Sequence, residues 1–527
     1  MPTPRKAKGA PVPKCTKLTL RRAFAAPKHA EKAIALTMVL IATGVLFLET
    51  KDYALLGWDS YPAIVTSSVR SFSDFIKNFT EELLDGRREF KMYRPLLNLS
   101  FALDHALWGL EPFGYQLTNA LLFACSAGSL YVLVRRASGA GASVAPLAAL
   151  TFFLIHPVHV EVLPVPPRRP EMLCCMFMSL SLALQLSPRA LGMRTPPVVP
   201  ALFALLAIAS KETGMMLPVL SFGAVLLYSP REGLPARVRH AATAVVPHLV
   251  VLLGALAARM AILGGMGGHL STQISETVNR FPYSASRMVA RLAFPQPLMQ
   301  KSLEGKLVFV VVALGLALTG TLTVLLGQRS TVARASQRRL VRTAVIAVAW
   351  LVLMGLTYAA SIRIAPWYVL LPAAASAMLV GALADGLVGA IRRGRLPTRI
   401  AATPTLLLLA GLVIWQGCYS PLVNSYGEWH RATLASRSFL RELRCQIRSA
   451  SDGSVLEAPP IPTQVQPNDD RPCIQGAHVL CAYSVQAWAE LVFPRRRIRV
   501  LEAKDASGEE PHADEVLVVV TNRMDGF

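Results

Sequence analysis

The sequence predicts an α-helical polytopic membrane protein with about 11 transmembrane helices, amphipathic helices in an outer loop and a small C-terminal α/β domain. Hydrophobic residues make up 53% of the 527 residues and charged residues only 16%, and the mean hydropathy is +0.43. This composition excludes a water-soluble globular protein. The segments that are apolar enough to cross about 30 Å of hydrocarbon as helices lie near residues 33–48, 114–134, 143–162, 171–187, 196–210, 213–229, 241–262, 306–327, 343–361, 366–390 and 401–418.

The basic residues indicate how these helices are oriented. The tail, residues 1–32, is rich in Lys and Arg, and every second loop after it is basic. Because Lys and Arg in short loops are retained on the cytoplasmic side, we expect a multi-pass protein of the cell membrane with a cytoplasmic N-terminus and an extracytoplasmic C-terminus. The Ala-, Arg- and Gly-rich composition favours a bacterial inner membrane. The net charge of +22 is then a topology signal, and it does not predict a nucleic-acid partner.

The first outer loop, residues 49–113, carries a candidate catalytic residue. Asp59 stands in the run Trp58-Asp59-Ser60-Tyr61, just outside the first predicted membrane helix. A carboxylate in this place is either a general base or a solvated group beside an aromatic anchor at the membrane interface. In the same loop, residues 69–84 place apolar side chains on one side, which predicts an amphipathic helix in the interface plane.

A second group of polar residues lies where the apolar run 143–162 ends. The sequence His156-Pro157-Val158-His159-Val160-Glu161 is followed by Arg169 and Glu171, and the next outer turn is Ser210-Lys211-Glu212-Thr213-Gly214. Ionisable residues beside a bilayer are costly unless they bind something polar. Structural roles also fit the same residues. Arg169 can extend to lipid headgroups, Lys211 and Glu212 can pair with each other, and one histidine can satisfy a backbone group.

The last third of the chain supplies one more candidate and a change of composition. Arg363 precedes Pro366, Trp367 and Tyr368, which are residue types that begin helices and mark the membrane interface. The Gly-rich and then basic loop 263–305 predicts either a gate over the outer face or a simple interfacial helix. Residues 427–527 predict a small extracytoplasmic α/β domain with helices at 427–449 and 483–493 and strands at 497–503 and 515–521. The predicted domains are therefore the cytoplasmic tail 1–32, the transmembrane domain 33–426 and this C-terminal domain.

Five motifs in this order resemble those of the GT-C superfamily of integral-membrane glycosyltransferases. They are Asp59; Tyr93-Arg94-Pro95-Leu96; Trp108-Gly109-Leu110 with Gly114 through Asn119; the His156–Glu161 run with Arg169; and Ser210 through Gly214. Within the superfamily the chain looks most like the transmembrane-and-tetratricopeptide mannosyltransferase-like (TMTC) proteins, as a bacterial relative without 34-residue helical repeats. The resemblance covers about residues 35–435. The chain departs from the family pattern at Ser60, where a second acid often follows the first, and at Gln116, where a histidine is usual.

The resemblance implies transfer of a sugar from a polyprenyl-phosphate-linked donor to an acceptor on the extracytoplasmic face. It implies that Asp59 is the general base, since an acceptor hydroxyl needs help to lose its proton. Fixed cations are needed for the lipid phosphate that leaves, and the candidates are Arg94, Arg169, Lys211 and Arg363. The candidates for positioning donor or acceptor, or for holding a divalent cation with Asp59, are His156, His159, Glu161, Glu171 and Glu212.

Several alternatives stay open at this point. The sequence requires no cofactor and leaves a divalent cation as an option, and it does not say whether the acceptor is a glycan, a lipid or a protein. A non-catalytic envelope scaffold that keeps the fold without the chemistry fits the missing second acid. A transporter fits less well, because its polar residues would lie at the membrane midplane.

Overall fold

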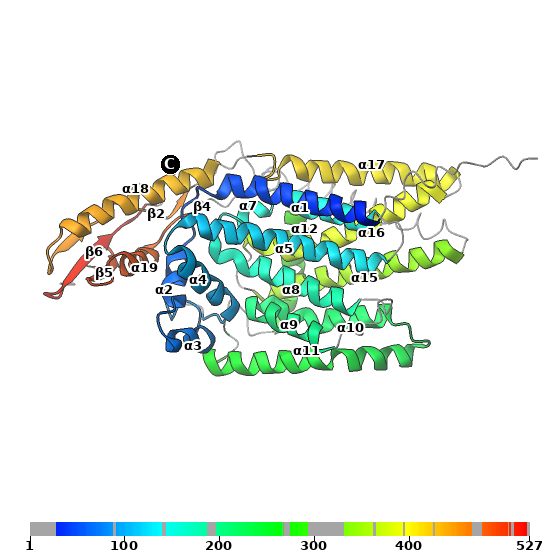
Figure 1. Cartoon of the computed structure of the whole chain (residues 1–527), viewed down its shortest axis with the longest axis horizontal. Helices are drawn as coiled ribbons and strands as arrows, with labels where there is room; N and C mark the ends of the chain where they lie inside the picture. Colours follow the sequence, from blue (N-terminus) through cyan, green and yellow to red (C-terminus); the bar gives the residue numbers. More distant parts are fainter. Residues whose placement is uncertain are drawn as a thin grey trace, which may run out of the picture.

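The computed structural model describes residues 28–87, 91–139, 144–186, 197–265, 267, 274–293, 331–361, 365–393, 396–424, 427–465, 477–503, 505–506 and 511–523. Long helices run side by side along the longest axis, and shorter helices and all the strands of the described residues gather at one end (Figure 1). The predicted α-helical polytopic membrane architecture is confirmed.

Among the residues that the structure describes, six helices are long and apolar enough to cross a membrane. They are α1 (Lys28–Thr50), α5 (Pro112–Ser138), α11 (Leu234–Leu263), α15 (Thr331–Ala360), α16 (Leu370–Arg393, extended by the short η4, Pro366–Val369) and α17 (Leu396–Cys418). The remaining predicted spans correspond to shorter helices, namely α6 (Ala145–Ile155), α8 (Arg169–Gln185), α9 (Val198–Ser210) and α10 (Leu217–Tyr228). The predicted span 306–327 lies outside the described residues. The predicted number of about 11 crossings is therefore not confirmed.

The predicted span 143–162 is not one helix. α6 ends at Ile155, and His156 has the extended backbone angles φ −65° and ψ 131°. A proline lacks the N–H that continues a helix, and it disfavours helical angles in the residue before it; Pro157 therefore breaks the helix at His156. The chain then makes α7 (His159–Val162) and the 3₁₀ turn η1 (Pro166–Arg168) before α8 begins. This break places the motif residues in a compact turn.

The first outer loop forms α2 (Ser60–Ser67), α3 (Phe72–Thr80) and α4 (Pro95–Trp108). The amphipathic helix expected over 69–84 is shorter than predicted. Ser71 and Asp74 form a reciprocal capping box that starts α3 at Phe72. The Phe72 side chain is 79% exposed, and a ring in this position suits a membrane interface.

The residues after α17, here named the C-terminal unit (residues 427–523), form a small α/β structure. Its long helix is α18 (Gly427–Ser449), and its shorter helix is α19 (Ala482–Val492). The main sheet is parallel and has the order β1-β6-β5, with Leu456 and Val500 on either side of Val518. The strands are β1 (Val455–Glu457), β2 (Ile461–Pro462), β3 (Gln464–Val465), β4 (Ala477–His478), β5 (Arg497–Glu502), β6 (Glu515–Val520) and β7 (Asn522–Arg523). α18 begins at the residue where the sequence predicted a new domain, but the domain division itself stays a prediction.

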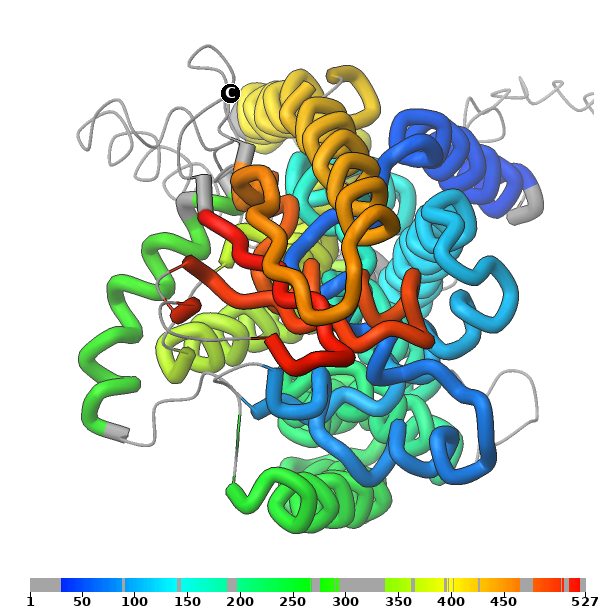
Figure 2. The backbone as a smooth tube through the Cα atoms, turned by 90° about the vertical axis from the view of Figure 1, so that its left-hand side faces the viewer, coloured from blue at the N-terminus to red at the C-terminus, as the bar shows by residue number. Residues whose placement is uncertain are grey.

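The C-terminal unit and the first outer loop share one hydrophobic core. Leu56 and Ile64 from the loop are buried in the same cluster as Trp429, Val485 and Trp488 from the unit. Seen from the end of the molecule, the unit lies in front of the helix bundle (Figure 2). The unit is thus packed on the bundle and shares its interior with α2.

At the opposite end of the bundle, Tyr228 at the end of α10 forms hydrogen bonds to neighbouring helices. Its hydroxyl donates a hydrogen bond of 3.0 Å to the carbonyl of Ala137 and lies 2.8 Å from the hydroxyl of Thr343. This contact joins α5, α10 and α15 near the basic loops, far from the C-terminal unit (Figure 1).

Candidate functional site

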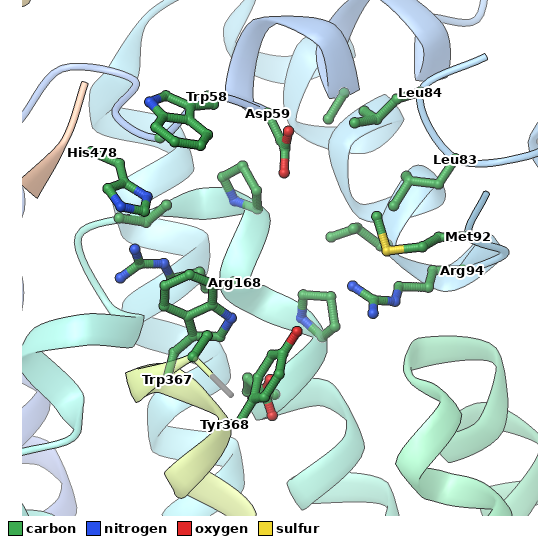
Figure 3. Close-up of a pocket in the computed structure, with 18 residues that line it drawn as sticks. Trp58, Asp59, Leu83, Leu84, Met92, Arg94, Arg168, Trp367, Tyr368 and His478 are labelled. Carbon is green, nitrogen blue, oxygen red and sulfur yellow. The ribbon is translucent and has the colours of Figure 1, made fainter. Parts of the chain in front are cut away.

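A cavity of about 410 Å³ lies where the first outer loop, the turn after α7, the start of η4 and the C-terminal unit meet. Its lining combines charged, aromatic and apolar side chains, and Figure 3 shows them around the open space. The lining residues that matter for chemistry are Trp58, Asp59, Arg94, Arg168, Glu171, Trp367, Tyr368 and His478. A pocket with a few convergent polar groups in an otherwise apolar lining is the usual form of a small-molecule site.

Asp59 is the residue before α2, and its side chain points into the cavity (Figure 3). The hydroxyl of Tyr483, in α19, donates a hydrogen bond to Oδ1 of Asp59 over 2.9 Å. The sequence predicted an active-site carboxylate here, and the structure places the carboxylate in the lining. Its partner Tyr483 was not predicted, since 424 residues separate the two in the chain.

Arg94 precedes α4 and faces the cavity from the side opposite Trp58 (Figure 3). Its Nη2 lies 2.9 Å from Oε2 of Glu212, and Nη1 of Arg259 lies 3.3 Å from Oε1 of the same carboxylate. Burial alone raises the pKa of Glu212, but the guanidinium groups of Arg94 and Arg259 outweigh burial and bring the pKa to about 2. Burial lowers the pKa of Arg94, and Glu212 more than reverses this effect, so that the net shift is upward. Glu212 thus serves as the carboxylate that holds Arg94 in place.

The predicted phosphate-binding residue Arg169 and its neighbour Arg168 have different surroundings. Arg168 lines the cavity, where its guanidinium lies 3.8 Å from the centre of the Trp367 ring and 2.9 Å from Oε2 of Glu161. Burial lowers the pKa of Arg168, and the carboxylates of Glu161, Asp59 and Glu171 oppose that shift in decreasing order. The sequence named Arg169 as a phosphate-binding candidate, whereas in the structure its neighbour Arg168 lines the cavity.

Arg169 is 0% exposed and does not line the cavity. Its guanidinium pairs with Asp104 and donates to Oδ1 of Asn119 over 2.6 Å and to the carbonyl of Tyr115 over 2.9 Å. Consecutive residues in a helix point about 100° apart, and here Arg168 faces the cavity while Arg169 faces α4 and α5. Arg169 instead joins α8 to α4 and α5.

The two histidines of the motif are also buried away from the cavity. Nδ1 of His156 accepts a hydrogen bond from the backbone N–H of Val158 over 3.1 Å. Nε2 of His159 lies 2.6 Å from the carbonyl of Phe153, and the His159 ring packs edge-on against Phe123 and Phe153. Neither histidine is in the cavity lining, and neither is Glu161. The sequence offered these three residues as possible cation ligands together with Asp59, but in the structure they do not line the cavity that Asp59 lines. Glu161 instead pairs with Arg168, which does line it.

Glu171 and Lys211 form a buried ion pair at the floor of the site. Glu171 lines the cavity, whereas Lys211 lies behind it, with its ammonium 4.2 Å from the centre of the Tyr368 ring. Lys211 thus partners a carboxylate and does not line the cavity. Arg363, the fourth predicted cation, lies outside the described residues.

A metal site built on His156, His159 and Glu161 is not supported by their positions. Within the described ranges, no three His, Cys, Asp or Glu side chains come together as a metal ion would require. The residues that the sequence reasoning missed are Arg168, Arg259, Trp367, Tyr483 and His478. Of these, only Trp367 carried a sequence signal, as an interface aromatic beside Tyr368.

No family model matches the chain. Among curated proteins, the mouse (Mus musculus) protein O-mannosyl-transferase TMTC2 is 36% identical over 108 residues, which is 20% of this chain and 13% of the mouse protein. The Xenopus laevis tmtc2 protein is 37% identical over 16% of this chain and 10% of its own length, and the Drosophila melanogaster Tmtc1 protein is 29% identical over 33% and 21%. The chain therefore matches only a small part of these relatives. The resemblance to the TMTC proteins indicated by the motifs is confirmed over that part.

Solved structures with a similar arrangement include ArnT from Cupriavidus metallidurans bound to undecaprenyl phosphate. Its sequence is 15% identical, the TM-score is 0.46, and the alignment covers 88% of this chain and 89% of that one. The Archaeoglobus fulgidus oligosaccharyltransferase in the apo form aligns with 13% identity and a TM-score of 0.40, over 88% of this chain and 64% of that one.

Proposed function

We propose that this protein is a GT-C-type membrane glycosyltransferase. It moves a sugar from a polyprenyl-phosphate-linked donor to an acceptor on the extracytoplasmic face, with Asp59 as general base. The observation that carries the proposal is a cavity that Asp59, Arg94 and Arg168 line together (Figure 3). The local sequence similarity to protein O-mannosyl-transferases supports the reaction class.

The proposed reaction is a direct displacement at the anomeric carbon. The acceptor oxygen forms a bond to that carbon while the bond from the carbon to the phosphate oxygen breaks, and the electron pair leaves with the lipid phosphate. Asp59 takes the proton from the acceptor hydroxyl, which accelerates such a step by about 10²–10⁴. The negative charge that develops on the phosphate needs donors that are already in place.

The two sides of the cavity suit two different parts of such a reaction. On one side Arg94 lies beside Leu83, Leu84 and Met92 (Figure 3), and a cation next to apolar side chains fits a phosphate attached to an isoprenoid chain. On the other side Trp58, His478 and Trp367 offer aromatic and polar groups. Asp59 lies between the two sides, where a base would meet the acceptor hydroxyl.

In this proposal the acceptor is a glycan, a lipid or a protein, and the chain crosses a cell membrane with its N-terminus in the cytoplasm. The two carboxylates of the cavity, Asp59 and Glu171, are each held by a neighbouring side chain. The proposed steps are accordingly assigned to the chain's own residues.

The test is transfer by the purified full chain in lipid nanodiscs. The donors are radiolabelled hexoses and pentoses linked to undecaprenyl phosphate, with a bacterial membrane extract as the source of acceptor. We expect wild type to consume at least one donor and Asp59→Asn to lose about 10²-fold or more of that turnover. Asp514→Asn is the matched control, because Asp514 forms only an exposed pair with Arg497, 2.8 Å away. Equal turnover by Asp59→Asn would remove Asp59 as the base, and no turnover by wild type with any donor would contradict the donor class.

A further inference from the structure

The C-terminal unit holds the segment that carries Asp59 through hydrogen bonds to backbone carbonyls of the unit and through ring stacking. The N–H of Gly57 donates to the carbonyl of His478 over 3.1 Å, and the indole N–H of Trp58 donates to the carbonyl of Thr463 over 3.1 Å. The rings of Trp58 and His478 also stack, with centroids 4.5 Å apart and planes 8° from parallel. These contacts join residues more than 400 positions apart at the edge of the cavity.

Two consecutive residues at the start of α19 complete the contact. The hydroxyl of Ser484 donates to the carbonyl of Trp58, and the hydroxyl of Tyr483 donates to Oδ1 of Asp59 over 2.9 Å. The first of these bonds fixes the backbone, and the second reaches the carboxylate itself. Because the hydroxyl engages one oxygen of the carboxylate, rotation of the Asp59 side chain is restricted.

Asp59 lacks the support that its own helix would ordinarily give. An Asp before the first turn of a helix commonly accepts hydrogen bonds from the backbone N–H groups of that turn. The side chain of Asp59 makes no such capping bond to α2. The carboxylate therefore points away from the helix it precedes, and Tyr483 supplies a donor in a different direction.

The contact between the C-terminal unit and the segment around Asp59 is supported by a packed core. α19 packs directly on α2, and Val485 and Trp488 are buried in the same core as Leu56 and Ile64. A separation of the C-terminal unit from the bundle would expose this shared core to water, which is costly in proportion to the apolar area. The unit is thus a fixed part of the wall of the cavity.

We infer that the C-terminal unit completes the catalytic site and that Tyr483 is a positioning residue, which orients the carboxylate of Asp59 toward the acceptor. This inference rests on the proposed function, because it assigns to Tyr483 a role that acts through the general base. A carboxylate held by one hydroxyl donor is aligned before the acceptor arrives, so that less reorganisation is needed during proton transfer.

The test compares Tyr483→Phe with Tyr228→Phe in the full chain in nanodiscs, using the donor that wild type consumes. Both variants keep the aromatic ring and lose a part-buried hydroxyl. The hydroxyl of Tyr483 bonds to Asp59, whereas that of Tyr228, at the end of α10, contacts Ala137, Arg339 and Thr343 and no residue of the cavity lining. We expect Tyr483→Phe to lower kcat about tenfold or more while the KM for the donor changes less than twofold, since the hydroxyl touches the base and not the lipid. Tyr228→Phe should leave both constants unchanged. Tyr228→Phe should lose at least as much thermal stability as Tyr483→Phe, because its hydroxyl contacts three groups.

A double-mutant cycle separates positioning from a general structural effect. In the Asp59→Asn background, Tyr483→Phe should cause no further loss of the residual turnover, because residues that act as a unit are not additive. Additive losses, or a Tyr483→Phe variant with wild-type kcat beside an inactive Asp59→Asn, would overturn the inference and leave the proposed function standing. Wild-type turnover in Asp59→Asn, or no turnover by wild type, would overturn both.

Discussion

A variant of Arg169 distinguishes a structural role of this residue from the predicted phosphate-binding role. We consider Arg169→Met, which keeps much of the side-chain volume and removes the charge. The change leaves the carboxylate of Asp104, only 1% exposed, without its cationic partner. Removing one partner of a buried ion pair costs about 3–5 kcal/mol, because the remaining charge stays out of water without compensation. Asp104 would keep only the hydrogen bond that it accepts from the hydroxyl of Thr118 over 2.6 Å.

The assay is thermal unfolding of the purified protein together with binding of undecaprenyl phosphate below the unfolding temperature. Arg169→Met should lower the free energy of unfolding by about 3–5 kcal/mol and leave the Kd for undecaprenyl phosphate unchanged. The double variant Arg169→Met/Asp104→Leu should recover part of the stability, because it removes both charges together. A variant with wild-type stability that no longer binds the lipid would refute the reasoning and return Arg169 to the donor site.

Two further predictions concern Glu212 and Gly57. The pKa of Glu212 falls from its ordinary value of 4.5 to about 2, so its contribution to the free energy of unfolding is complete above pH 4.5 and is lost as the pH falls toward 2. Glu212→Gln should therefore lose about 3 kcal/mol of the pH-dependent part of the free energy of unfolding. The measurement is unfolding of the variant and of wild type between pH 6 and pH 2. A variant with the wild-type acid profile would show that the two arginines do not stabilise this carboxylate. Gly57→Ala should lower the free energy of unfolding by about 1–2 kcal/mol and reduce turnover. Gly57 has a φ of +91°, and an added Cβ would lie 2.6 Å from Cγ1 of Val165. The control is Gly44→Ala, where an added Cβ meets nothing within 4 Å, and equal behaviour of the two variants would contradict this prediction.

Local patterns were sufficient to predict most helices and two strands of the C-terminal unit. The strands expected at 497–503 and 515–521 are β5 and β6, and the helix expected at 483–493 is α19. Hydrophobic periodicity carries this information because it depends on neighbours within one or two turns. Hydropathy alone could not show that Pro157 breaks the span 143–162, because the residues on both sides of the break are apolar.

The partners of the site residues could not be predicted in the same way. Periodicity did not distinguish Arg168 from Arg169, since the choice depends on where α8 begins within the turn. Nor could it link Tyr483 to Asp59, because that contact exists only after α19 packs on α2. Sequence reasoning therefore named three of the four charged side chains that line the cavity, namely Asp59, Arg94 and Glu171. Tertiary packing decided which of the other named residues lie outside the lining.

The charged groups of the cavity follow one arrangement that explains why so many ionisable residues gather here. Asp59, Arg94, Arg168 and Glu171 line the cavity, and each has a partner that does not line it. These partners are Tyr483, Glu212, Glu161 and Lys211, respectively. A buried charge is tolerable only when it is paired and hydrogen-bonded. The partners therefore offset the desolvation of the four lining side chains, each of which still faces the cavity. Groups held in this way are oriented before a ligand arrives, and such preorganisation gives fixed charges their value in a reaction that moves negative charge onto a phosphate. The polar residues outside the lining are therefore as necessary to the proposed chemistry as those within it.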